Sequence, residues 1–69
     1  MLSLDDQSLF AVLARYARAR REGADGKEAF QQARDHARAL HATGELSDAG
    51  YVVAVDEIRG YRDIDSQGS

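Results

Sequence analysis

The chain has 69 residues, a net charge of −3, and neither cysteine nor proline. A chain this short forms one small domain, which buries only about 60% of the surface that its unfolded form exposes. No disulfide can form, no apolar run approaches the roughly 20 residues of a membrane span, and the start MLSLDDQ lacks the pattern of a secretory signal. These features exclude a membrane protein and predict a cytoplasmic one.

The first helix is predicted to run from Leu4 to Glu22. Its start can be capped in two registers, by Ser3 or by Asp5, and both begin the same helix. At about 100° per residue one face of this helix is apolar, which predicts that it packs against the rest of the chain. The apolar face holds Leu9, Leu13, Tyr16 and Ala17, with Phe10 and Val12 at its margins.

The second helix is predicted from Gly26 to Thr43. Asp25 can cap its first turn together with Glu28, and Gly44 is placed to take the left-handed conformation after its last turn. A row of alanines predicts that another helix approaches this one closely, and the alternative is that these residues are only good helix formers. The row consists of Ala29, Ala33 and Ala37, flanked by Phe30 and Leu40.

The third helix is predicted over residues 48–61, where Ser47 supplies an N-cap and Asp48 an acid in the first turn. Tyr51 and Ile58 then fall on one face of a helix, together with Ala54 and Val55. Residues 51–55 are also good strand formers. The alternative is therefore a short strand that pairs across a dimer.

These elements predict an all-α fold in one domain, residues 1–62, with a disordered tail at 63–69. The first two helices are expected to form an antiparallel hairpin to which the third is added. The stretch GELSDAGY, residues 44–51, resembles the turn of short C-terminal SHOCT-type helical hairpins. This resemblance covers eight residues, implies a helix that stops and restarts, and carries no function.

A homodimer is expected, because a single chain would leave more apolar surface in water than a small domain normally tolerates. Self-association would also stabilise a domain that has no disulfides. The residues expected to be covered by the second chain are Leu9, Val12, Leu13, Tyr16 and Val52.

No set of residues predicts catalysis, a metal site or a cofactor. His36 and His41 are five residues apart, which separates them by about 140° on a helix instead of stacking them as ligands. Asp56 and Glu57 are adjacent and point about 100° apart, so they cannot form a carboxylate dyad. The chain also lacks a phosphate-binding loop and a nucleophile elbow, so an enzyme is not expected.

Four arginines lie close together in the stretch ARYARARREG. Arg15 and Arg18 point away from the apolar stripe of the first helix, whereas Arg20 continues that stripe. One interpretation is that Arg20 lays its stem on Tyr16 or Phe30 and keeps its head in water. The other is that Arg20 reaches an acid on another chain.

A DNA-binding regulator that uses the Arg15–Arg21 helix is an alternative function. The charge argues against it, because residues 1–22, 23–44 and 45–69 carry +1, 0 and −4, which together make −3. The arginines are interspersed with alanines instead of base-reading polar residues. Nucleic acid is therefore not the expected partner.

The function expected is binding to a host or other cellular protein. Eight arginines against one lysine indicate a GC-rich genome, and small size, acidity and the lack of a catalytic set resemble the small phage-encoded proteins that bind and disable host proteins. The resemblance implies targets such as a quorum-sensing receptor, a motor ATPase or a CRISPR complex, inhibited by occlusion. A structural adaptor or assembly subunit is a further alternative. The expected partner-binding residues are Tyr16, Arg20, Tyr61 and Arg62.

Overall fold

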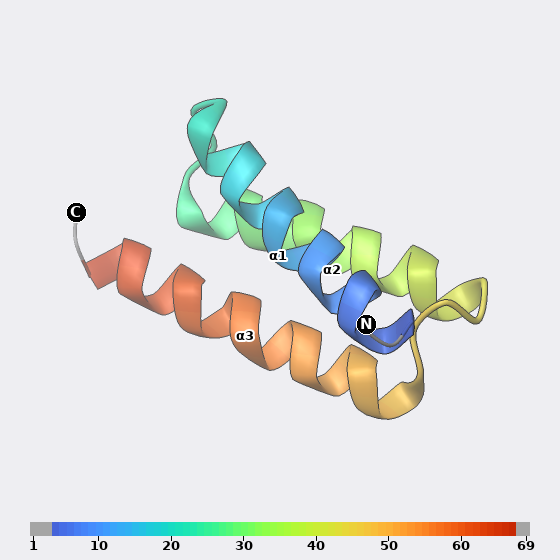
Figure 1. Ribbon diagram of the computed structural model, residues 1–69. Helices are drawn as coiled ribbons and strands as arrows, with labels where there is room; N and C mark the ends of the chain where they lie inside the picture. Colours follow the sequence, from blue (N-terminus) through green and yellow to red (C-terminus); the bar gives the residue numbers. More distant parts are fainter. Residues whose placement is uncertain (1–3, 68–69) are drawn as a thin grey trace.

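The computed structural model describes residues 4–67, and these form three helices and no strand. They are α1 (Leu4–Arg21), α2 (Gly26–Ala42) and α3 (Asp48–Gln67). Figure 1 shows that α2 returns beside α1 and that α3 crosses below both. The all-α prediction is confirmed, and the first two helices lie within one residue of their predicted bounds.

Residues 51–55 are helical, so the alternative of a strand at this position is wrong. The start of α3 is capped as predicted, because the Gly50 N–H donates to the Ser47 hydroxyl oxygen over 3.0 Å. Ser47 in turn donates from its own N–H to Asp5 Oδ1 over 3.0 Å, which ties α3 to the first turn of α1. The Ser47 hydroxyl also donates a hydrogen bond to Asp5 Oδ2, and this bond, together with the one from the Ser47 N–H, lowers the pKa of Asp5.

The ends of α2 also form as the sequence predicts. Asp25 is the N-cap, and its Oδ1 accepts a hydrogen bond of 2.8 Å from the Glu28 N–H. At the other end Thr43 is the C-cap, and Gly44 follows with a φ of +84°. A side chain at that φ meets its own backbone, which is why glycine closes this helix.

Replacing Gly44 with alanine is expected to lower the free energy of unfolding by about 1–2 kcal/mol, because the left-handed conformation strains any residue with a Cβ. Gly60 provides the matched control, because it lies inside α3 and a Cβ built on it meets nothing within 4 Å. Gly60→Ala is expected to raise the free energy of unfolding by about 0.5–1 kcal/mol. Urea denaturation measures both changes, and two shifts of the same sign would contradict the prediction.

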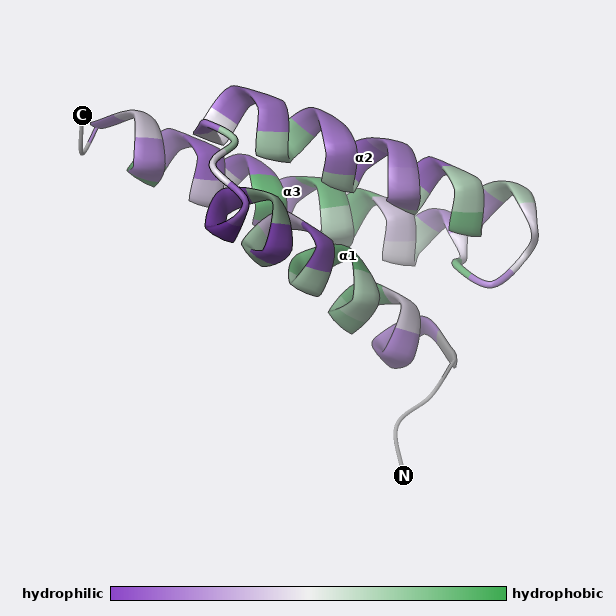
Figure 2. Ribbon diagram, turned by 90° about the horizontal axis from the view of Figure 1, so that it is seen from above, coloured by the Kyte–Doolittle hydropathy of each residue, from purple (hydrophilic) through white to green (hydrophobic). Residues whose placement is uncertain are grey.

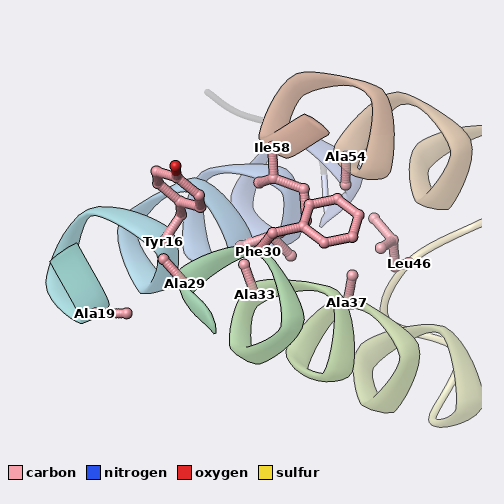
Figure 3. Packing of buried hydrophobic residues seen from close by; sticks show 10 residues of the cluster. Tyr16, Ala19, Ala29, Phe30, Ala33, Ala37, Leu46, Ala54 and Ile58 are labelled. Atoms are coloured by element: carbon pink, nitrogen blue, oxygen red, sulfur yellow. The ribbon is translucent and has the colours of Figure 1, made fainter. Parts of the chain in front are cut away.

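The core is one cluster to which α2 contributes three alanines and Phe30. It consists of Val12, Tyr16, Ala19, Ala29, Phe30, Ala33, Ala37, Leu46, Ala54 and Ile58. In Figure 3 the side chains of Leu46, Ala54 and Ile58 gather around Phe30. The three alanines of α2 are fully buried, so they do more than favour a helix: they let neighbouring helices approach closely.

The predicted dimer interface needs correction at two positions. Val12 is fully buried within the single chain, so it is not available to a second copy, and Tyr16 is 4% exposed and offers a second copy little surface. The reason is that α3 lies against both other helices and covers the face that a two-helix hairpin would leave open. Val52 remains exposed, and Leu9 and Leu13 are half-buried.

The predicted tail also needs correction, because α3 continues through Gln67. Residues 63–67 are therefore helical, and residues 68–69 lie outside the described part of the chain. The physical reason is a tertiary contact: the Asp65 carboxylate accepts a hydrogen bond from Tyr16 and pairs with Arg20, both on α1. This contact holds the last turns of α3 on the domain, and short-range sequence patterns do not reveal it.

Candidate protein-binding groove

A groove of about 420 Å³ lies between α1 and the C-terminal half of α3. Polar and apolar residues alternate along the helices, as the hydropathy colouring of Figure 2 shows, which is the pattern of amphipathic helices. The groove is lined by residues of α1 and α3. Its lining consists of Leu13, Tyr16, Ala17, Arg20, Tyr61, Ile64 and Asp65.

One end of the groove is polar and centred on the Asp65 carboxylate. The Tyr16 hydroxyl donates a hydrogen bond to Asp65 Oδ2, and Arg20 Nε lies 3.3 Å from the same oxygen. Arg20 also donates from a terminal nitrogen to the Ala24 carbonyl oxygen over 2.9 Å. The acid that Arg20 reaches is therefore on its own chain, which corrects the interpretation that it extends to another chain.

The environment of Tyr16 stabilises its protonated form. Burial and the hydrogen bond to Asp65 raise the pKa of Tyr16 to about 12, against an ordinary value of 10.0. A tyrosinate at this position would be poorly solvated and would face a carboxylate. The hydroxyl is therefore a fixed hydrogen-bond donor, and it does not serve as a base at neutral pH.

This shift predicts a loss of stability at alkaline pH. The folded-state pKa lies above the unfolded one, so the contribution of Tyr16 is complete below pH 10 and is lost as pH rises towards about 12. Thermal unfolding of the wild type and of Tyr16→Phe across this interval tests it. We expect the wild type to lose more stability than the variant, and parallel curves would contradict the assignment.

The walls of the groove are apolar and partly exposed. The rings of Tyr16 and Tyr61 lie 5.7 Å apart between centroids, with an interplanar angle of 41°. Ile64 is 66% exposed, although it is a large aliphatic side chain. Phe10, 69% exposed, lies one helical turn before Leu13 on α1. Apolar side chains this exposed, gathered around a hollow, are typical of a binding surface.

The structure brings together three of the four predicted partner-binding residues. Tyr16, Arg20 and Tyr61 line the groove, whereas Arg62 lies outside this lining. The guanidinium carbon of Arg62 lies 4.5 Å from the centre of the Phe30 ring, and a terminal nitrogen pairs with Asp63 at 3.2 Å. Arg62 therefore has a structural partner in the domain.

Sequence reasoning missed Ile64 and Asp65, because both fall in the segment predicted to be a tail. The signal was present in their spacing: Ile64 follows Tyr61 by three residues and Asp65 by four. This spacing continues the helical face of Ile58 beyond Gly60. A run of acids and small residues, DIDSQGS, obscured it.

The arginine-rich stretch is largely engaged within the chain. Arg15 donates to the Gln32 side chain over 3.4 Å, and Arg18 pairs with Glu22 at 3.5 Å. Arg20 is held by Asp65. Such exposed contacts are individually weak, yet each places an acid or a polar group beside a cation that a phosphate would have to approach.

Within residues 4–67 no three histidine, aspartate or glutamate side chains gather to hold a metal ion. His41 bonds to Asp48, and its ring lies tilted against the ring of Tyr51. Over the described part of the chain no helix combines the length and the apolar character that crossing a membrane requires. Comparisons of the chain with protein-family models, curated proteins and solved structures gave no match.

Proposed function

We propose that this is a non-enzymatic protein-binding protein that inhibits a host protein by occlusion, as the small phage-encoded inhibitors do. The observation that carries the proposal is the groove, in which exposed apolar side chains surround a hollow next to an ordered polar end. The proposal includes a homodimer whose first two helices form an antiparallel hairpin. The proposed target is a protein such as a transcription regulator, a motor ATPase or a CRISPR complex.

The geometry supports binding in two ways. The groove contains tyrosine and arginine, which dominate the binding energy of protein interfaces. Its polar end is already ordered, because Asp65 holds both Tyr16 and Arg20 in the free chain. A partner that inserts an apolar side chain therefore incurs little loss of side-chain entropy in this protein.

The contacts that the arginines make within the chain favour a protein target over DNA. Arg15, Arg18 and Arg20 all contact polar or acidic groups of the chain itself. A surface that binds phosphates by releasing counterions needs a broad positive patch, and this chain is acidic overall.

A nuclease-treated pull-down from a GC-rich bacterial lysate tests the proposal. The bait is the wild type, Ile64→Glu in the groove, or Val52→Glu as the matched control. Val52 is an exposed aliphatic residue of the same helix, 58% exposed, and does not line the groove. We expect one stoichiometric protein with the wild type and the control, and at least a tenfold loss with Ile64→Glu, since an unpaired charge would face an apolar surface.

Circular dichroism confirms that each bait is folded, which both substitutions should allow because both side chains are exposed. Equal capture by Ile64→Glu and the wild type would contradict the groove. Recovery of nucleic acid without nuclease, and of nothing with it, would favour the DNA-binding alternative.

A further inference from the structure

The outer face of α1 carries a stripe that reads Asp6, Phe10, Leu13, Ala17, Arg21. The spacings are four, three, four and four residues, so at about 100° per residue these side chains fall on one side of the helix. Phe10, Ala17 and Arg21 are exposed, and Leu13 is half-buried. Because Leu13 and Ala17 also line the groove, the stripe forms its α1 wall.

This stripe is complementary to itself when it is read backwards. Two antiparallel copies of α1 that cross between Leu13 and Ala14 place residue 10 opposite residue 17 and residue 6 opposite residue 21. A large aromatic side chain, Phe10, then faces the small Ala17 of the partner subunit. An acid, Asp6, faces a cation, the partner subunit's Arg21. Both matches occur twice, as a two-fold axis requires.

The groove supplies the space that Phe10 of a second copy needs. Ala17 leaves room on the α1 side, and Tyr61 and Ile64 form the apolar wall on the α3 side. A cavity of roughly 150 Å³ is enough to hold a benzene molecule, and the groove measures about 420 Å³. The exposed Phe10 and the open groove would thus be the two halves of one contact.

The charges at the ends of α1 favour the same arrangement. Its first turn carries Asp5 and Asp6, and its last turn carries Arg18, Arg20 and Arg21. Antiparallel packing brings each acidic end beside a basic end and also opposes the helix dipoles. Parallel packing would place like charges together at both ends.

We propose that the groove is the interface of a two-fold homodimer, in which α1 packs antiparallel on α1 of the partner and each Phe10 enters the other chain's groove. This deepens the proposed function and rests on it, because the second copy occupies the same groove as the target. Dimer formation and target binding then exclude each other, so the free protein covers its own apolar surface until a target displaces the second copy.

Sedimentation equilibrium over a range of concentrations tests the dimer. We expect the wild type to reach twice the 7.6 kDa of one chain. Phe10→Glu should raise the dissociation constant by about a hundred- to ten-thousandfold, because each dimer buries two Phe10 side chains. Val52→Glu introduces the same charge at a position of α3 that does not line the groove, and it should leave the dissociation constant unchanged. Helicity by circular dichroism shows that each variant is folded.

A charge exchange tests the two-fold geometry. Arg21→Asp alone and Asp6→Arg alone should each weaken the dimer, because each places like charges opposite one another. The double variant should recover most of the wild-type constant, since every facing pair is again of opposite sign. Failure of the double variant to recover would overturn the proposed register.

These experiments distinguish a failure of the proposed dimer from a failure of the proposed function. A wild type that stays monomeric, or a dimer insensitive to Phe10→Glu, overturns the two-fold interface, whatever the pull-down shows. A dimer that dissociates with Phe10→Glu, in a protein whose captured partner does not depend on Ile64, supports this interface and contradicts the groove as target site.

Discussion

Ile58→Ala is expected to lower the free energy of unfolding by about 2–5 kcal/mol. Ile58 is fully buried in α3 and lies beside Phe30 in the core. Its truncation removes apolar burial and leaves a cavity between helices whose backbones cannot close it completely. For a domain of 60–100 residues each kcal/mol lowers the melting temperature by roughly 4–8 °C, so a large fraction of the chains would be unfolded at moderate temperature.

Val52 provides the control for this prediction, because it is an aliphatic residue of the same helix that does not line the groove. It is 58% exposed, so Val52→Ala should change the free energy of unfolding by no more than about 0.5 kcal/mol. Chemical denaturation followed by circular dichroism measures both variants. Similar losses for the two would mean that α3 does not pack on the core through Ile58.

Ala33→Leu is expected to lower the free energy of unfolding by about 1–3 kcal/mol. Ala33 lies in the middle of the alanine row of α2 and is fully buried, so three additional carbon atoms would have to be placed inside the core. The longer side chain would push neighbouring helices apart and disturb the packing around Phe30. The free energy of unfolding from urea denaturation is again the measurement.

Ala39→Leu is the matched control, because Ala39 lies on the exposed face of the same helix. Leucine and alanine have similar helix propensities, so this change should be nearly neutral. If Ala33→Leu were equally neutral, the alanines of α2 would be only helix formers, as the sequence alone allowed.

The sequence by itself determined the elements whose causes are local. Asp25 bonds to a backbone N–H three residues away, Ser47 does the same, and Gly44 follows directly on the helix that it closes. Apolar spacing then gave the buried faces of α2 and α3. Interactions across one helical turn are set by neighbouring residues, so spacing is sufficient to predict them.

Only the tertiary structure determined which helix faces pack against one another within the chain. Val12 is expected at a dimer interface from the sequence, yet it is fully buried within one chain. The groove depends on Asp65, whose hydrogen bond to Tyr16 joins residues 49 positions apart. That contact determines where Arg20 points. It is also the reason why residues 63–67 are helical. A contact between distant residues depends on how helices pack in space, and no local pattern records it.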